Sequence, residues 1–307
     1  MKIIITGATG FIGSRLSKRL IDSGHAVIAL SRDPEKAQRI LGNEITCLMW
    51  AGKDIVPWVD QLNGDYGIIN LAGENIAAGR WSAERKKRIL RSRVEAGEII
   101  VNAARQAKKK PEFMIQASAI GIYGSSRDIV LDEQTNPGEG FLADVCKRWE
   151  ESSKELENMQ IRRIIIRTGV VLGKNGGIIK KMTLPFKLFM GGPPGSGKQG
   201  FSWIHIEDEI RAIIFLLESK NQKGIFNLTA PNPVTMSKFT KIFGNALKRP
   251  SWLPVPSFVL KIMFGEMAEE MILSGQKVLP KALLKEGFTF NFPDLKEAVT
   301  DLTGSNT

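Results

Sequence analysis

The sequence predicts an α/β fold in which a doubly wound parallel sheet is followed by a smaller C-terminal α+β unit. Short apolar runs rich in β-branched residues alternate with longer amphipathic segments from residue 1 to about residue 230, as in strands joined by helices. The runs are almost continuously apolar, and parallel strands that are covered by helices on both faces require such a composition. In a sheet of this kind the ligand lies outside the carboxyl ends of the strands.

The alternation gives each element in order. Helices are expected near residues 11–23, 82–107, 143–157, 207–219 and 236–247. Strands are expected at residues 2–6 (KIIIT), 26–30 (AVIAL), 67–72 (GIINLA), 113–118 (FMIQAS), 162–171 (RRIIIRTGVV) and 225–230 (IFNLTA).

The pattern changes after residue 231, where Pro-rich joints such as KRPSWLPVPS interrupt the rhythm of the strands. We therefore expect a sheet unit over residues 1–233 and a smaller unit over residues 234–307 that packs against it and completes the substrate pocket.

Composition narrows the possible partners. The 307 residues carry a net charge of +11, which favours anions, but charge alone does not choose among them. The densest basic run, RKKRILRSR at residues 85–93, has apolar residues at helical spacing and is interpreted as the solvated face of a helix. No run approaches the roughly 20 apolar residues that span a bilayer. Two cysteines suffice for neither a disulfide framework nor a structural zinc site. We expect a cytoplasmic protein without a metal, a nucleic-acid partner or a membrane partner.

A glycine-rich turn joins the first strand to the first helix. In ITGATGFIG, Gly7, Gly10 and Gly13 follow the strand directly. Glycine permits the tight turn, lets the backbone approach a pyrophosphate and lets the helix pack closely, while the helix N-terminal amides bind the anion. The pattern is GxxGxxG, and its context predicts a Rossmann-type dinucleotide site that also includes Thr9, Phe11 and Ile12.

A second glycine-rich loop, GGPPGSGKQG at residues 191–200, has a similar spacing but the wrong chemistry. Gln199 stands where a triphosphate loop needs Ser or Thr for magnesium, two prolines remove amide donors, and a strand-like run follows in place of a helix. We interpret the loop as a rim of the substrate pocket in which Ser196, Lys198 and Gln199 are polar contacts. A surface loop without a ligand is the alternative.

The end of the second strand, IALSRDP, selects the cofactor. Acidic residues here bind the ribose hydroxyls of NAD, whereas an arginine accommodates the 2′-phosphate of NADP. Ser31 and Arg32 occupy this place, about 19 residues after Gly13. The sequence therefore predicts NADP(H).

The motifs together resemble those of the extended short-chain dehydrogenases/reductases, which include nucleotide-sugar epimerases. The resemblance rests on TGATGFIG, on NLAG at residues 70–73, on IYG at 122–124 and on WIHIEDEIRAI at 203–213. More narrowly, GRWS, RTGVVLG, GGPPGSGKQGFSWIHI and the tail from PVPSFVLK to FTFNFPDL are similar to atypical epimerase-family proteins with a C-terminal domain of unknown function. This match covers essentially the whole chain.

The resemblance also implies a catalytic helix that departs from the family pattern. Active extended members use a Tyr-x-x-x-Lys helix, in which the phenol transfers a proton and the lysine lowers its pKa. The corresponding helix here, GFLADVCKRWEESS, contains no tyrosine. One alignment places Leu142 and Cys146 at the two positions, and a shift of one residue places Ala143 and Lys147 there.

Three residues are candidates for the missing acid or base. Glu74 follows the fourth strand, where partial burial would help a carboxyl group to exchange a proton, and Asn75 beside it is a candidate substrate contact. Ser118 lies near the serine/threonine position of the family, although a stricter alignment places Ala119 there. Tyr123 is the third candidate, at a position that is usually structural in the family.

The resemblance implies further cofactor contacts. Arg93, one helical step after Arg88, falls where related enzymes place a residue that faces the cofactor phosphates. The remaining contacts implied by the family pattern are Leu71, Ala72, Gly73, Ser118 and Val170.

Three functions remain open. The first is an NADP(H)-dependent oxidoreductase of the epimerase type that acts on an unidentified small molecule with an altered acid/base set. The second is a non-catalytic protein that binds or senses NADP(H). The third is a nucleoside-diphosphate-sugar epimerase, against which the missing tyrosine and lysine count. A homodimer is possible, with the helices near residues 82–107 and 143–157 as its contact surface.

Overall fold

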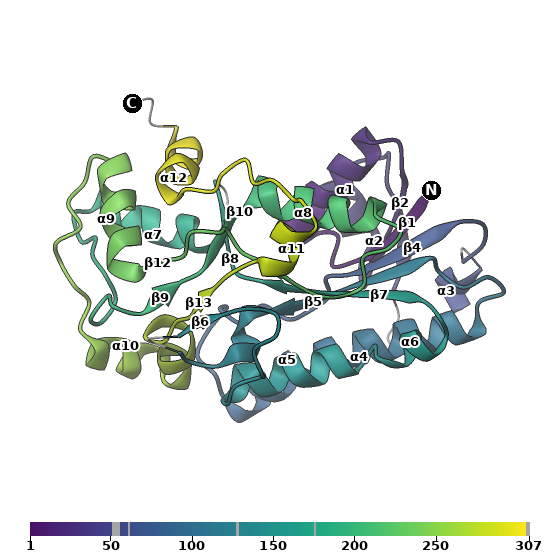
Figure 1. The fold of residues 1–307 in the computed structure, drawn as a ribbon, viewed down its shortest axis with the longest axis horizontal. Helices are drawn as coiled ribbons and strands as arrows, with labels where there is room; N and C mark the ends of the chain where they lie inside the picture. Colours follow the sequence, from purple (N-terminus) through teal and green to yellow (C-terminus); the bar gives the residue numbers. More distant parts are fainter. Residues whose placement is uncertain (51–55, 61, 127–128, 175, 305–307) are drawn as a thin grey trace.

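A seven-stranded parallel sheet forms the centre of the molecule (Figure 1). The computed structural model describes residues 1–304 except 51–55, 61, 127–128 and 175. The strand order is β11-β7-β5-β4-β1-β2-β3, and each neighbouring pair is parallel. The strands of this sheet are β1 (Lys2–Thr6), β2 (Ala26–Ser31), β3 (Thr46–Met49), β4 (Tyr66–Asn70), β5 (Phe113–Ala119), β7 (Arg162–Thr168) and β11 (Gly224–Leu228).

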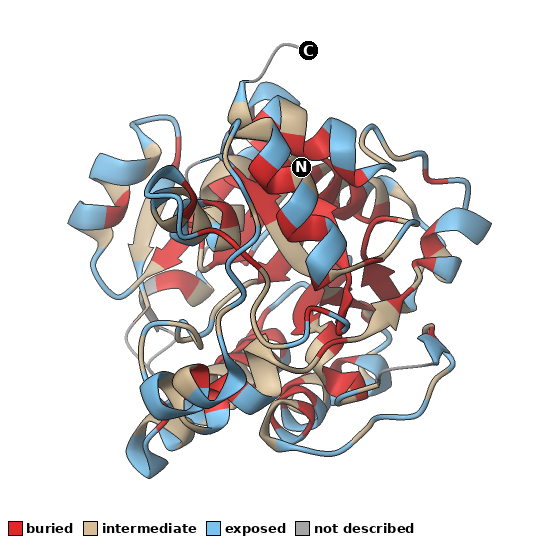
Figure 2. Cartoon of the chain, turned by 90° about the vertical axis from the view of Figure 1, so that its left-hand side faces the viewer, coloured by how far each residue is buried: buried red, intermediate tan, exposed pale blue. Residues whose placement is uncertain are grey.

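Helices cover both faces of the sheet. Successive residues of β1 point to opposite faces, so that Ile3 and Ile5 join one buried cluster and Ile4 joins another. The first cluster is completed mainly by α1 and α8, and the second by α4 and α6; Figure 2 shows the buried strands inside and the exposed outer sides of the helices. The helices around the sheet are α1 (Phe11–Asp22), α2 (Pro34–Leu41), α3 (Val56–Val59), α4 (Ala83–Gln106), α5 (Phe141–Glu151), α6 (Glu155–Asn158), α8 (Ile206–Glu218) and α11 (Lys281–Lys285).

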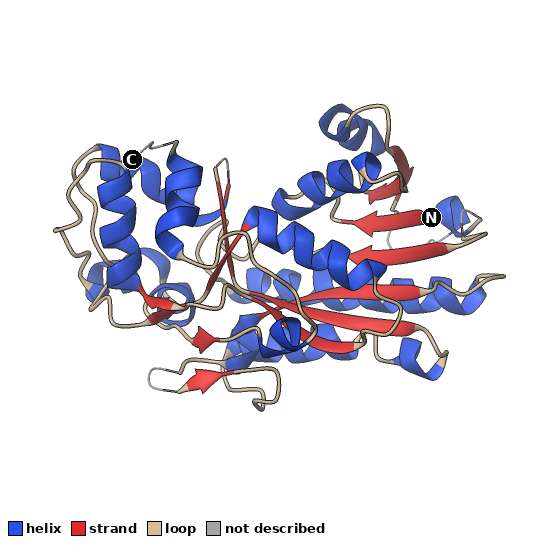
Figure 3. Ribbon diagram, turned by 45° about the horizontal axis from the view of Figure 1, so that its top comes forward, coloured by secondary structure: helices blue, strands red, loops and turns tan. Residues whose placement is uncertain are grey.

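A second unit lies beyond the carboxyl ends of the strands (Figure 3). It contains three pairs of short strands: β6 (Val130–Leu131) with β13 (Lys277–Val278), β8 (Val170–Gly173) with β10 (Trp203–His205), and β9 (Gly200–Phe201) with β12 (Val234–Thr235). Its helical segments are α7 (Gly177–Lys187), α9 (Met236–Ala246), α10 (Ser257–Phe264), the π-helix η2 (Ala268–Ile272) and α12 (Leu295–Thr303). A 3-10 turn, η1 (Ile120–Tyr123), follows β5.

The predicted fold class is confirmed, and the differences from the expected elements have physical causes. The long strand expected at 162–171 breaks at Gly169, where a Cβ atom would lie 2.9 Å from the carbonyl oxygen of Ser202. Beyond this point β8 leaves the large sheet and pairs with β10. The helix expected at 143–157 is two helices, α5 and α6, separated by residues 152–154.

The division at residue 233 remains a prediction, but the hydrophobic core does not follow it. One buried cluster joins residues before that point with residues of α9 and α12, including Leu172, Phe186 and Trp203 on one side and Phe243 and Leu295 on the other. The parts of the chain before and after residue 233 therefore share a core within this second unit. Among the described residues, no helix is long and apolar enough to span a bilayer.

Candidate functional site

The glycine-rich turn lies at the carboxyl edge of the sheet, between β1 and α1. Gly7 has a φ of +72°, and a Cβ atom there would lie 2.6 Å from the carbonyl oxygen of Leu71. A Cβ atom at Gly13 would lie 2.3 Å from the carbonyl oxygen of Gly7. Both positions therefore require glycine, because the turn, the end of β4 and the start of α1 approach one another at backbone distance.

The N-terminus of α1 is open to an anion. Its N-cap is Gly10, and no side chain caps the helix. Thr9 and Gly10 are exposed, whereas Phe11 and Ile12 are half-buried and pack on the core. Since the first amides of a helix carry partial positive charge, this turn fits the pyrophosphate of a dinucleotide. The residues predicted from the GxxGxxG pattern are thus brought together at one place.

The end of β2 separates an arginine from the neighbouring acid. Arg32 is exposed. The Asp33 carboxylate caps α2 by accepting a hydrogen bond from the amide of Lys36 at 2.9 Å. The Ser31 hydroxyl donates to the carbonyl oxygen of Asp33 at 3.0 Å. An acid that already caps a helix competes poorly for a ribose diol, so the arrangement suits a phosphate beside Arg32.

Arg93 lies against the segment that follows β4. Its Nη1 donates to the carbonyl oxygens of Glu74 and Ile89, and its guanidinium lies 4.9 Å from the ring centroid of Trp149. A Cβ atom at Gly73 would come within 3.0 Å of the Arg93 Cζ. Burial lowers the pKa of Arg93. The arginine is therefore fixed beside the turn of Leu71, Ala72 and Gly73, all three partly or fully accessible.

Glu74 is held by two cations. Its carboxylate lies 3.8 Å from Nη2 of Arg85 and 3.3 Å from Nε of Arg88, and its side chain is 29% exposed. The carboxylate of Glu74 is therefore held in place between the two arginine side chains of α4. The Asn75 side chain accepts a hydrogen bond from the amide of Ala77 and so shapes the same loop.

The Ser118 hydroxyl is part of a buried polar network. It donates to the carboxylate of Glu150 at 2.6 Å, and Ser118 is only 4% exposed. Arg167 donates two hydrogen bonds of 2.9 Å to the same carboxylate. Because its one proton is already donated, Ser118 can only accept a further hydrogen bond.

Tyr123 belongs to the same network. Its hydroxyl donates to the Asn227 side chain at 2.7 Å and accepts from Arg167 at 3.1 Å. Burial raises the pKa of the Tyr123 phenol, and the hydrogen bond from Arg167 opposes this shift. The sequence analysis missed Glu150 and Arg167, although an arginine in the apolar run RRIIIRT signals that a buried partner must exist.

Helix α5 presents no phenol to the site in either alignment. Lys147 is exposed and donates to the carbonyl oxygen of Gly138 at 2.8 Å. Cys146 is buried, and burial raises the pKa of its thiol to about 11. Leu142 and Ala143 line a pocket in front of the helix. Helix α5 therefore supplies no phenol for the missing tyrosine, and its Lys147 is engaged by the carbonyl oxygen of Gly138.

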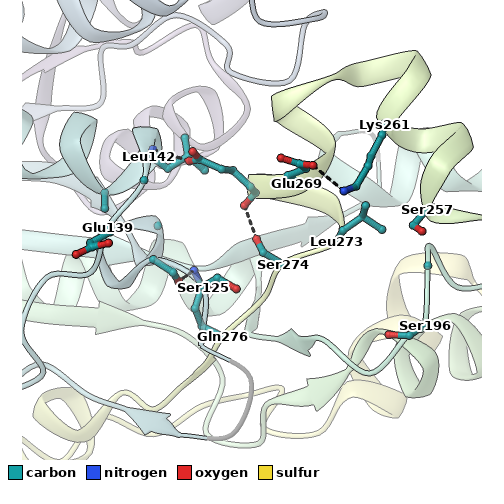
Figure 4. Close-up of a pocket in the computed structure, with 16 residues that line it drawn as sticks. Ser125, Glu139, Leu142, Ser196, Ser257, Lys261, Glu269, Leu273, Ser274 and Gln276 are labelled. Atoms are coloured by element: carbon teal, nitrogen blue, oxygen red, sulfur yellow. Dashed lines mark hydrogen bonds and ion pairs between the residues drawn. The ribbon is translucent and has the colours of Figure 1, made fainter.

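The pocket has a volume of about 550 Å³ and lies between η1, the start of α5, the loop at residues 195–196, α10 and η2 (Figure 4). Glu270 of η2 accepts hydrogen bonds from the amides of Phe141 and Leu142, and so caps α5 across the pocket. Glu269 pairs with Lys261 at 2.7 Å. The charged side chains of the lining are three glutamates and this one paired lysine, among the described residues.

The loop at residues 191–200 is only partly as expected. Ser196 lines the pocket, and Lys198 is exposed. Gln199, however, is buried, and its side-chain amide donates to the carbonyl oxygens of Pro194 and Ile272. A substrate contact of Gln199 remains a prediction, and in the structure its amide donors hold the loop to the C-terminal unit.

Val170, a cofactor contact implied by the family pattern, is the first residue of β8. Val170 is half-buried, and its amide donates to the carbonyl oxygen of Ser202 at 2.9 Å. Asp208 accepts the amides of Asn291 and Phe292, which fastens the chain before α12 to α8. The described residues contain no cluster of three or more His, Cys, Asp or Glu that could hold a metal ion.

Two family models match consecutive parts of the chain. Residues 3–229 match the NAD dependent epimerase/dehydratase family, and residues 255–302 match a domain of unknown function, DUF1731. The first match covers most of the chain. The protein belongs to the NAD dependent epimerase/dehydratase family, as the resemblance predicted.

Several relatives match over the whole length. The chain is 41% identical to the chloroplastic SDR39U1 homolog of Arabidopsis thaliana, an epimerase family protein, over 97% of this chain and 86% of that relative. It is 39% identical to the epimerase family protein YfhF of Bacillus subtilis, over 98% of each chain.

Solved structures are similar as well. The human epimerase family protein SDR39U1, crystallised with NADPH, is 33% identical, with a TM-score of 0.88 over 100% of both chains. A nucleoside-diphosphate sugar epimerase from Corynebacterium glutamicum is 30% identical, with a TM-score of 0.78 over 99% of this chain and 58% of that chain. UDP-glucuronic acid 4-epimerase from Bacillus cereus is 15% identical with a TM-score of 0.77, a likeness of fold alone.

Proposed function

We propose that the protein binds NADP(H) at the turn between β1 and α1. The observation that carries the proposal is the backbone approach at Gly7 and Gly13 beside a helix N-terminus without a side-chain cap. The similar human protein, which crystallised with NADPH, supports the same cofactor. Gly7, Gly10 and Gly13, with Thr9 and the amides of α1, would hold the pyrophosphate.

The preference for NADP(H) over NAD(H) follows from the end of β2. Arg32 is exposed there, and the carboxylate of Asp33 is engaged as the cap of α2. A charge-assisted hydrogen bond is worth about 1.5 to 3 kcal/mol, which corresponds to a preference of about ten- to hundredfold for the phosphorylated cofactor. Arg88 and Arg93 are the further proposed cofactor contacts.

We infer an oxidoreductase that acts on a small polar molecule. Bound NADP(H) would supply hydride chemistry at the end of the sheet. Glu74, which Arg85 and Arg88 hold in place, would accept the oxygen-bound proton of a hydroxyl substrate. Ser118 would accept a hydrogen bond and orient the substrate, because its own proton goes to Glu150.

A second function, a non-catalytic protein that binds or senses NADP(H), is favoured by a separate observation. The hydroxyl protons of Ser118 and Tyr123 are both donated to buried partners, and α5 carries no phenol. A protein that only reports the state of its cofactor would need no proton donor at all. We propose a cytoplasmic location for either function.

The pocket disfavours the third function, a nucleoside-diphosphate-sugar epimerase. A diphosphate requires cations or helix amides, but the charged lining consists of Glu139, Glu269, Glu270 and a lysine already paired with Glu269. The amides at the start of α5 are occupied by Glu270. We therefore propose an uncharged or cationic substrate with hydroxyl groups.

The cofactor proposal is tested by titrating the protein with NADPH and NADH and following nicotinamide fluorescence. We expect tighter binding of NADPH, and a loss of about ten- to hundredfold for NADPH in Arg32→Ala with little change for NADH. Arg39→Ala, an exposed arginine on α2, is the matched control. Equal affinities of the wild-type protein for both cofactors would refute the assignment.

The catalytic proposal is tested by supplying NADP⁺ or NADPH with a panel of polyols, amino sugars, carbonyl compounds and nucleotide sugars. Turnover that Glu74→Gln abolishes while NADPH binding persists supports the oxidoreductase. Binding of NADPH without turnover on any panel member favours the non-catalytic function. Isomerisation of a nucleotide sugar would revive the epimerase.

A further inference from the structure

The net positive charge of this protein arises from two stretches of the chain that contain no acidic residue. Residues 174–206 contain five lysines and residues 219–265 contain seven lysines and arginines, and neither stretch contains an aspartate or a glutamate. The rest of the chain carries 31 basic and 32 acidic residues. The whole excess of +11 therefore comes from these two stretches, which supply α7, α9, α10 and the loops between them.

The same two stretches hold most of the exposed apolar side chains. Nine of the fifteen large apolar residues that are exposed in the described part of the chain lie in them. Trp252 is 72% exposed, Ile262 is 70% exposed and Phe258 is 64% exposed. We call this set the outer apolar patch: Leu184, Leu188, Phe189, Met190, Trp252, Leu253, Phe258, Ile262 and Met263.

The two halves of the outer apolar patch lie side by side. The guanidinium of Arg249 lies 4.8 Å from the ring centroid of Phe189. The amide of Leu253 donates to the carbonyl oxygen of Gly191 at 3.1 Å. The loop before α10 therefore runs along the chain that follows α7, and α10 continues from it at the end of the molecule that is remote from the N-terminus (Figure 1).

Cations neighbour the residues of the outer apolar patch in the sequence, and Arg249 also lies against Phe189 of the patch. Lys187 lies in the last turn of α7, Lys248 and Arg249 precede Trp252, and Lys261 lies on α10 between Phe258 and Ile262. Lys187, Lys248 and Lys261 are exposed. Glu266 pairs with Lys86 and Glu269 pairs with Lys261, so the cations that the patch offers to a partner are Lys187, Lys248 and Arg249. An apolar surface with aromatic side chains and a basic surround is the composition of a protein face that lies in a lipid interface.

We propose that the outer apolar patch docks on a membrane surface that contains anionic phospholipids. The apolar side chains enter the boundary between headgroups and acyl chains, and the surrounding lysines and arginines contact the lipid phosphates. The attachment is peripheral, since no described helix could span the bilayer. The proposal departs from the sequence-based expectation that the protein has no membrane partner.

Two other occupants fit the outer apolar patch less well. A second copy of the chain would bring two such basic surfaces together, and the like charges would repel one another. Nucleic acid would satisfy the cations, but it would leave exposed aliphatic side chains such as Ile262 and Leu184 without apolar contact. An anionic lipid surface matches both the charge and the apolar area.

The test is flotation of the purified full-length protein with vesicles of phosphatidylcholine alone or of phosphatidylcholine with phosphatidylglycerol. We expect binding to the anionic vesicles that weakens at high salt, and little binding to the neutral ones. The double variant Phe258→Glu/Ile262→Glu should lose at least tenfold in vesicle affinity. The matched control is Ile40→Glu/Leu284→Glu, which adds the same two charges at apolar residues that are 51% and 47% exposed and outside the patch.

Two double lysine variants distinguish local contacts of the patch with lipid from an effect of the overall charge. Lys187→Gln/Lys248→Gln should weaken vesicle binding about thirtyfold, since each lysine near the surface contributes about fivefold. Lys18→Gln/Lys36→Gln removes the same charge from exposed positions on α1 and α2 and should leave the affinity nearly unchanged. Melting temperatures establish that each variant is folded.

Three results would overturn the proposal. The first is no flotation with anionic vesicles at low salt. The second is an equal loss of affinity in the patch variants and their controls. The third is a protein that light scattering shows to be dimeric and that becomes monomeric in Phe258→Glu/Ile262→Glu, which would assign the patch to a second copy.

Discussion

The carboxyl group of Glu209 is buried away from solvent. The residue is fully buried in the first turn of α8, its Oε1 accepts a hydrogen bond from Thr168 at 2.9 Å, and its Oε2 has no hydrogen-bond partner among the described residues. Burial raises the pKa of Glu209 from 4.5 to about 8. The folded protein therefore holds a proton on Glu209 at neutral pH that the unfolded chain releases.

This proton makes stability depend on pH. Because the folded-state pKa is the higher one, the stabilisation is complete below pH 4.5 and is lost as the pH rises towards 8. Glu209→Gln removes the titration and keeps an oxygen for Thr168. We expect it to raise the free energy of unfolding at pH 8, by about 1.4 kcal/mol for each unit of the shift, and to change it little at pH 5.

Urea unfolding at the two pH values measures the difference. Glu98→Gln, an exposed carboxylate on α4, is the control and should behave alike at both. A Glu209→Gln protein that is equally destabilised at pH 5 and pH 8 would show that the carboxyl group is ionised in the folded state.

The sequence was least informative about the hydrogen-bond partners of single polar side chains. Ser118, Tyr123 and Gln199 were named from their place in the sequence, and the structure buries all three and engages their side chains in hydrogen bonds. The direction and partners of a polar side chain depend on residues far away in the chain: Tyr123 bonds Asn227, and Gln199 bonds the carbonyl oxygen of Ile272. Such pairings leave no periodic signal in a sequence.

At the scale of the element, the turn from β1 into α1 carries the cofactor prediction. Gly13→Ala would put a Cβ atom 2.3 Å from the carbonyl oxygen of Gly7, and backbone cannot yield as a side chain can. Gly10→Ala places its Cβ atom at 3.1 Å from the same oxygen, a much smaller clash. We expect Gly13→Ala to lower both the melting temperature and the affinity for NADPH by more than Gly10→Ala does.

Thermal melting and NADPH titration of the two variants check this ranking. The comparison is internally matched, since both variants add one methyl group to the same turn. Wild-type affinity in Gly13→Ala would contradict the placement of the pyrophosphate against this backbone.

Buried elements were predictable and partly exposed ones were not. The strands β1, β4 and β5 are almost entirely buried, so their apolar runs are unbroken. The edge strand β3, TCLM, has no fully buried residue, and α7 contains Pro185. Both therefore lack the composition by which their class is recognised, and the sequence analysis named neither.

At the scale of the whole molecule, the core that joins the chain before residue 233 to the chain after it should make these two parts unfold together. Leu295 of α12 is 3% exposed and belongs to the cluster that also contains Leu172 and Trp203. Leu295→Ala should therefore lower the free energy of unfolding of the whole chain by about 2–5 kcal/mol.

Circular dichroism and tryptophan fluorescence should report one common transition that shifts as a unit. Leu284→Ala, at a leucine that is 47% exposed on α11, is the control and should change the transition little. Two separate transitions, of which Leu295→Ala moves only one, would show that the units are independent.

The expected homodimer remains a prediction without apolar support. The large exposed apolar residues of the described chain include none on α4 or α5, the helices proposed to pair. A contact there would be polar. Because the outer apolar patch belongs to other helices, pairing through α4 and α5 is compatible with membrane docking.

The cap that Glu270 places on α5 has a consequence for protein engineering and for evolution. One wall of the pocket supplies the carboxylate and the opposite wall supplies the two amides that receive it. A chimaera that joins the C-terminal part of one homologue to the N-terminal part of another must therefore preserve these two hydrogen bonds. Without them the first amides of α5 lose their acceptor and the carboxylate of Glu270 loses its donors. New specificities in such proteins should arise by substitutions inside the pocket more readily than by recombination of whole segments.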